Sequence, residues 1–129
     1  MTFQKFSVLI NCERGSAAVE AAFLLPPFLI MLFGIIQVST LLWTLGSLHY
    51  AAEAAARYAS VNCAVSCTPD PATYALDSYY GQSLGGTNPF SYSAATGCGN
   101  TVTASYTYSL NIPLVGSYSV PLTTAACFP

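Results

Sequence analysis

The chain has 129 residues, enough for one small domain, and it is unusually apolar: 53% of its residues are hydrophobic and only 6% are charged. Soluble domains carry about 25% charged residues, so this deficit favours a chain that is embedded in a membrane or buried in an assembly. The formal net charge of −2 offers no basic surface for nucleic acid, and the single histidine, His49, leaves little material for general-base or metal chemistry.

A run without any charged residue, residues 21–48, dominates the first half of the chain. A helix of about 20 apolar residues crosses a bilayer, and we predict a transmembrane span over residues 21–45. The alternative of a buried helix is disfavoured, because a soluble domain this small does not cover so long an apolar helix. A cleaved secretory signal is also disfavoured, since its hydrophobic region has about 7–15 residues. We therefore expect the run to remain in the mature protein.

The charges that flank this run predict its orientation. Lys5 and Arg14 precede it, whereas Arg57 on the downstream side is set against Glu53. The positive-inside rule then places residues 1–15 in the cytoplasm and the residues after about 48 outside.

Glu20 lies just inside the apolar run, where a carboxylate costs free energy. Two interpretations compete: the side chain extends to the interface at the end of the helix, or it has a specific partner. A short hydrophilic leader ends at Arg14-Gly15, and the apolar residues begin after Gly15. This context favours a specific partner.

Gly15, Ser16 and Glu20 resemble the prepilin signal of type IV pilins, in which a membrane aspartyl peptidase cuts after the glycine. Cutting after Gly15 would make Ser16 the first residue and Glu20 the fifth, as in that family. The wider string "RGSAAVEAAFLLPPFLIMLFGIIQ" resembles the TadE-like family of tight-adherence (Flp) pilus proteins. Ser16 departs from the phenylalanine common at the start of major type IV pilins, which favours the TadE-like branch.

The resemblance implies a cleaved leader over residues 1–15 and an assembly role for Glu20, whose carboxylate would pair with the new α-ammonium of a neighbouring subunit. It implies a minor pilin or pseudopilin in the bacterial inner membrane, with its head periplasmic or extracellular, which acts in pilus assembly, surface adhesion and biofilm formation. The implied partners are other pilin subunits, the prepilin peptidase and the inner-membrane assembly machinery. The alternative is a membrane-anchored extracytoplasmic binding protein that never polymerises.

One long helix is predicted over residues 16–61, because the alanine-rich string "HYAAEAAARYASVN" continues the helical pattern beyond the membrane. We expect Glu53 and Arg57 to pair on one face of it. Another face carries residues at helical spacing: Tyr50, Ala54, Tyr58 and Val61. Pro26-Pro27 predicts a kink, which either lets subunits pack at an angle or has no consequence.

The remaining residues, 62–129, are predicted to form a small head with two disulfides. Cys12 falls in the leader, and an even set of cysteines is left: Cys63, Cys67, Cys98 and Cys127. A metal site is disfavoured, because it would need further Cys or His pairs at ligand spacing. Four cysteines allow three pairings.

Alternation in "TVTASYTYSL" predicts a half-buried strand, with one face formed by Val102, Ala104, Tyr106, Tyr108 and Leu110. "SYSVPLTTA" reads as the return strand, with Tyr118, Val120 and Leu122 inward, and "NIPLVG" as the turn. This hairpin would bring Cys98 near Cys127 and leave Cys63 to pair with Cys67. Because the two positions differ in parity, a bulge near Pro121 or frayed strand ends would be needed.

Between the cysteines, Asp70-Pro71 predicts the start of a short helix over residues 71–84, and residues 85–99 are predicted as loop. The expected fold is therefore α+β: a long transmembrane and extracytoplasmic helix with a small disulfide-bonded head that holds a short helix and an antiparallel hairpin. No constellation of catalytic residues or phosphate-binding loop is present in the sequence, so we expect neither an enzyme nor a cofactor.

Overall fold

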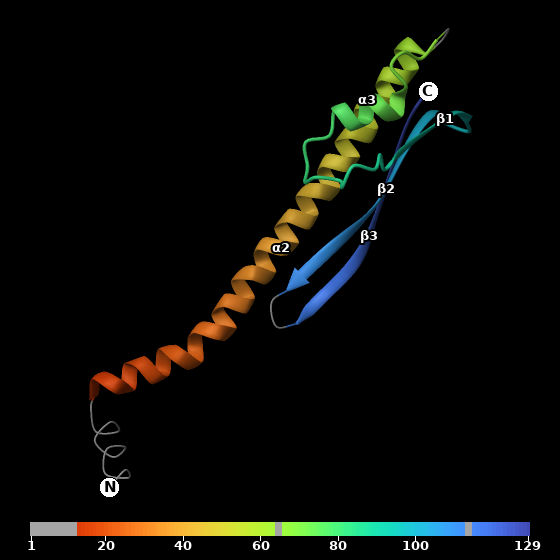
Figure 1. Ribbon diagram of the computed structural model, residues 1–129. Helices are drawn as coiled ribbons and strands as arrows, with labels where there is room; N and C mark the ends of the chain where they lie inside the picture. The colour runs from red at the N-terminus through yellow and green to blue at the C-terminus, as the bar shows by residue number, and fades with distance from the viewer. Residues whose placement is uncertain (1–12, 64–65, 113–114) are drawn as a thin grey trace.

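The computed structural model describes residues 13–63, 66–112 and 115–129. A long helix, α2 (Glu13–Asn62), is followed by a short helix, α3 (Pro71–Asp77), and by three strands, β1 (Phe90–Thr96), β2 (Gly99–Ile112) and β3 (Gly116–Phe128). The strands and α3 gather beside the C-terminal half of α2, and its N-terminal half projects away from them (Figure 1). The predicted α+β fold is confirmed.

The long helix has 50 residues, which corresponds to about 75 Å at 1.5 Å per residue. It begins at Glu13, so the last residues of the predicted leader are already helical. The chain stays helical through Pro26 and Pro27, although neither proline can donate a hydrogen bond to the preceding turn. The ribbon changes direction in its red-orange N-terminal part, as the predicted kink requires (Figure 1).

The three strands form one antiparallel sheet in the order β1-β2-β3. Val102, Ala104 and Tyr108 of β2 are buried and alternate with exposed residues, which confirms the predicted face. Tyr108 lies opposite Val120 in β3, as the hairpin prediction requires, and Leu122 is buried. The prediction that Tyr118 points inward is wrong, because this residue lies beyond the Tyr108–Thr40 contact and is 54% exposed.

One register holds along the whole β2–β3 pair, from Asn100 opposite Phe128 to Ile112 opposite Gly116, so the bulge considered near Pro121 is not formed. The parity difference disappears because Cys98 precedes β2 and is not bound by its register. The strand ends are not frayed either, since Cys127 is paired with Thr101 and Cys98 lies in the turn between β1 and β2.

The loop prediction for residues 85–99 is wrong over β1. Phe90 to Ser93 pair with β2, and the ring of Phe90 is buried in the core. The alternation of aromatic residues and serines in "FSYS" is a strand signal that the surrounding Gly, Asn and Thr residues obscured.

The helix predicted over residues 71–84 ends early. Asp70 caps its start as predicted, since its carboxylate accepts a hydrogen bond from the Ala72 amide at 3.1 Å. The helix stops at Asp77, because the Tyr80 amide donates to the Ser47 hydroxyl of α2 at 3.1 Å and not to a carbonyl one turn back. Contact with α2 thus overrides the local helical spacing.

The core lies between α2 and the inner face of the sheet. Its helix side is formed mostly by alanines at helical spacing, all at most 1% exposed: Ala51, Ala52, Ala55, Ala56 and Ala59. Their small side chains let the sheet approach α2 closely, and Val102 and Leu122 pack against them. A core this small buries little apolar area, so covalent cross-links contribute a large part of its stability.

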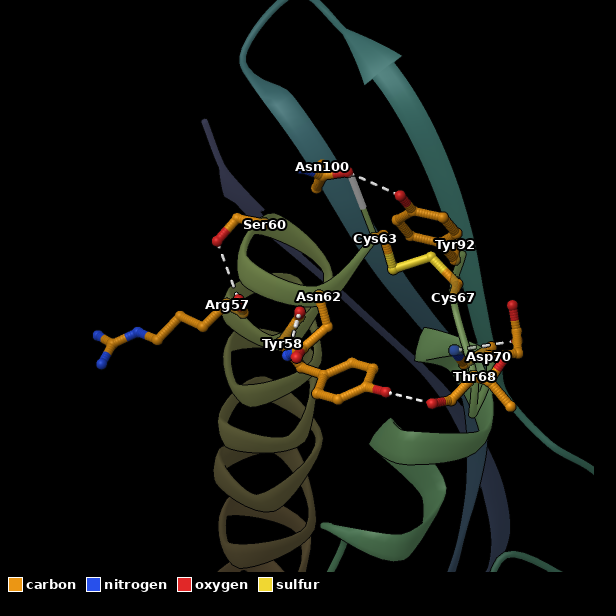
Figure 2. Close-up of a disulfide and its surroundings, with 11 residues drawn as sticks. Arg57, Tyr58, Ser60, Asn62, Cys63, Cys67, Thr68, Asp70, Tyr92 and Asn100 are labelled. Atoms are coloured by element: carbon orange, nitrogen blue, oxygen red, sulfur yellow. Dashed lines mark hydrogen bonds between the residues drawn. A yellow bond between two sulfur atoms is a disulfide. The ribbon is translucent and has the colours of Figure 1, made fainter. Parts of the chain in front are cut away.

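Two disulfides form as predicted, Cys63–Cys67 and Cys98–Cys127. The first closes a short loop directly after α2 (Figure 2). The second joins the β1–β2 turn to the end of β3, with the two Cα atoms 6.2 Å apart. The cross-links therefore fix both the exit from the long helix and the open end of the hairpin.

The predicted pair between Glu53 and Arg57 is replaced by other contacts. Glu53 lies 3.4 Å from the Nε2 atom of His49, one turn earlier. The guanidinium of Arg57 lies 4.9 Å from the centre of the Phe128 ring near the end of β3, which is a cation–π contact between helix and sheet.

Candidate functional site

The N-terminal half of α2 presents large apolar side chains on all sides. Phe23 is 77% exposed and Met31 is 67% exposed, and comparable exposure continues through Ile36 and Val38. An apolar surface this large is not stable in water and marks contact with a membrane or with another protein. By length and composition α2 can cross a membrane, and its apolar window has none of its residues buried in the fold.

The residues of the predicted processing signal lie together at the start of this helix. Gly15 and Ser16 are within the first turns of α2, and Glu20 follows Ser16 by about one turn. The Glu20 side chain is exposed, and the described residues provide it with no ion pair. Because the Glu20 carboxylate has no partner and lies beside an apolar surface, it can pair with a cationic group from another molecule.

The head first contacts α2 at the polar residues in the second half of the apolar run. The Thr40 hydroxyl is 2.9 Å from the Tyr108 hydroxyl of β2. Thr44 is buried and donates to the Thr40 carbonyl at 2.8 Å, while buried Ser47 accepts the Tyr80 amide. On the side that faces the sheet, hydrogen bonds to the head therefore begin at Thr40, and on the other side Trp43 is still 59% exposed.

A groove of about 590 Å³ lies along α2 toward its C-terminal end. Its lining includes Tyr50, Arg57, Tyr58 and Tyr74. The rings of Tyr58 and Tyr74 are stacked with their centres 4.3 Å apart. The Tyr58 hydroxyl donates to the Thr68 carbonyl at 2.8 Å, beside the Cys63–Cys67 loop (Figure 2). The helical recurrence of residues 50, 54, 58 and 61 predicted one face of this groove, but the sequence did not predict that α3 supplies the opposite wall.

Tyr79 of the head has a perturbed pKa. Burial raises the pKa of its phenol, Tyr106 adds to the rise, and Thr44 opposes it. The hydroxyl donates to the Gln82 carbonyl at 2.8 Å, so its contribution is to the structure of the segment after α3.

The four cysteines of the head are all held in disulfides and are not available as thiolates. Within the residues that the structure describes, no three His, Cys, Asp or Glu side chains come together as metal ligands.

The family model for TadE-like proteins matches residues 15–57. The chain is TadE-like over this segment. The match includes Gly15, Ser16 and Glu20, the whole exposed apolar part of α2, and the alanine-rich stretch that carries the sheet.

The whole head, residues 62–129, lies outside the TadE-like segment, which ends before Tyr58. No curated protein and no solved structure matches the chain. The role of the head must therefore be argued from its own residues.

Proposed function

We propose that this TadE-like chain is a minor pilin or pseudopilin of a Tad (Flp) pilus, cut by a prepilin peptidase between Gly15 and Ser16. Residues 1–15 would be the leader, residues 16–61 the spine and residues 62–129 the head outside the inner membrane. The observation that carries this proposal is the junction itself: the signal-like residues open directly into an exposed apolar helix within the TadE-like match.

The exposed position of Glu20 supports a role in assembly. Cleavage would leave an α-ammonium group on Ser16 at the edge of the bilayer, where an unpaired charge is unfavourable. The Glu20 carboxylate of a neighbouring subunit would neutralise it, with other pilin subunits and the inner-membrane assembly machinery as partners. The head would then act in assembly, in surface adhesion and in biofilm formation, and we assign it no catalytic activity and no cofactor.

A Glu20→Gln variant tests the assembly role in cells that contain a Tad system. Glu53→Gln is the matched control, because Glu53 lies on the same helix but beyond the apolar run, where it contacts His49. We expect Glu20→Gln to be cut and inserted normally but to be lost from sheared pili and from cross-links to other pilins, with Glu53→Gln unchanged. Normal recovery of Glu20→Gln in those fractions would contradict the role.

The groove along α2 favours the second candidate, a membrane-anchored binding protein that never polymerises. Stacked tyrosines beside Arg57 form a surface on which a ligand with a planar or anionic group can bind. Processing distinguishes the two candidates, since an anchored binding protein has no need for a cut at Ser16.

A further inference from the structure

The β2–β3 hairpin reaches back along α2 toward the segment that is apolar enough to cross a membrane. Tyr108 of β2 touches Thr40 of α2 through their hydroxyl groups. Beyond this contact β2 continues for four residues to Ile112, a length of at most about 13 Å at 3.3 Å per residue. The end of β2 and the start of β3 accordingly lie on the side of the N-terminal half of α2 (Figure 1).

A pocket lined by residues of both α2 and β2 shows how far along α2 the hairpin reaches. Asn111 of β2 lines a pocket of about 400 Å³ together with Ile36 and Gln37 of α2. These two helix residues lie before Ser39, the last residue before the hydrogen bond of Thr40 to the head. The strand ends therefore pass Ser39 by about 3–5 Å, at 1.5 Å per helix residue.

The hydrocarbon core of a bilayer can surround α2 only in the part of the helix N-terminal to its contacts with the head. The 19 residues from 21 to 39 span about 28 Å, close to the roughly 30 Å of a hydrocarbon core. With the outer boundary of the core near Ser39, the strand ends would lie within the outer leaflet, just below the interface.

The strand ends are uncharged and expose large apolar or aromatic side chains beside polar ones such as Asn111 and Ser117, a mixture that suits the interface. Val115 is 53% exposed and Tyr118 is 54% exposed, and the Tyr118 residue lies opposite Leu110. No charged residue or histidine follows Asp77 anywhere in the sequence. Trp43 is exposed on α2 one turn above Ser39, and tryptophan and tyrosine are enriched at membrane interfaces.

The charged side chains on the outer side of the membrane segment lie elsewhere. Glu53 and Arg57 are toward the C-terminal end of α2, while Asp70 and Asp77 are at the two ends of α3. In Figure 1 α3 lies beside the C-terminal part of α2, away from the end of β2 and the start of β3. The head thus has a charged outer end and an uncharged end that faces the membrane segment.

We propose that the strand ends around Val115 and Tyr118 form a second membrane contact, inserted into the outer leaflet of the bilayer that α2 spans. This inference rests on the membrane-spanning part of the proposed function. Two contacts fix the head against the bilayer surface, and the hairpin would have to leave the lipid when the subunit is extracted into an assembly.

Tryptophan fluorescence in lipid vesicles tests the proposal with the full chain. All variants carry Trp43→Phe, so that each has a single reporter: Tyr118→Trp and Val115→Trp at the proposed contact, Phe33→Trp within the span, and Ala125→Trp at the far, exposed end of β3. The vesicles contain phosphatidylcholine brominated on its acyl tails, and acrylamide serves as the quencher in water.

We expect the tail bromines to quench Tyr118→Trp and Phe33→Trp several-fold more strongly than Ala125→Trp, and acrylamide to show the reverse order. Val115→Trp should show the same quenching by both quenchers as Tyr118→Trp. Agreement between the two variants excludes misfolding of one of them as the cause of the result. If Phe33→Trp is quenched by bromines while both hairpin reporters are quenched only by acrylamide, the inference fails and the span stands. Hairpin reporters shielded from both quenchers would indicate a second copy of the chain and would also overturn it. If Phe33→Trp is not quenched by bromines, the membrane span and the inference fail together.

Discussion

The two disulfides close loops of very different length, which predicts unequal contributions to the stability of the head. The sequence separation is 29 for Cys98–Cys127 and 4 for Cys63–Cys67. If a disulfide acts by restricting the unfolded chain, these loops correspond to about 3.6 and about 1.9 kcal/mol at 25 °C. The longer loop also ties the β1–β2 turn to the last residues of β3, so its loss releases the open end of the sheet.

Two double variants measure this difference, Cys98→Ser with Cys127→Ser and Cys63→Ser with Cys67→Ser. The full chain in mild detergent is incubated in increasing urea and given a short pulse of thermolysin, which cleaves only unfolded heads. With a urea dependence of about 1.5 kcal/mol per molar, the midpoint should fall by about 2.4 M for the long loop and about 1.2 M for the short one. A short-loop variant that loses as much stability as the long-loop variant would refute the reasoning.

Three further predictions use the same assay. Gly99 has a φ of +113°, and a Cβ there would meet the last residues of the chain, so Gly99→Ala should lower the urea midpoint, whereas Gly97→Ala, with open space around it, should not. Ser47→Ala leaves the Tyr80 amide without its acceptor and should cost about 1–2 kcal/mol. Because the pKa of Tyr79 is raised in the folded head, stability should be full below about pH 10 and decline as the pH rises above it, and Tyr79→Phe should flatten that decline.

Strong periodicity in the sequence predicted the elements that depend on local pattern. The alternation from Val102 to Leu110 specified both β2 and its buried face, since one face of a two-layer fold must be apolar. The alanine-rich stretch of α2 likewise predicted a helix beyond the membrane. The cysteine pairs followed from the hairpin, because it brings the two ends of the sheet together.

Contacts between residues far apart in the sequence determined features that the local sequence pattern could not predict. The short helix α3 ends at Asp77 because Ser47, more than thirty residues earlier in the chain, takes the Tyr80 amide. The contact of Arg57 with the Phe128 ring depends on where β3 ends relative to α2, and local spacing does not predict it. The contact of Glu53 with His49 is an i,i+4 contact within α2, which the sequence analysis did not consider.

The candidate site was predictable to different degrees. The apolar span follows from composition alone, but the roles of Gly15, Ser16 and Glu20 came from family resemblance, since no spacing rule assigns them. The depth of the hairpin relative to Ser39 could not be predicted, because it depends on the register of β2 and on the point where the sheet meets the helix.

The N-terminus of the mature protein is the most direct test of the proposed function. The chain should be expressed with and without a prepilin peptidase, purified from membranes and sequenced from its first residue, with Gly15→Val as the variant that should resist cleavage. We predict a mature chain that starts at Ser16 only when the active peptidase is present. A chain that keeps its leader beside an active peptidase, or that starts at any other residue, would contradict the pilin assignment.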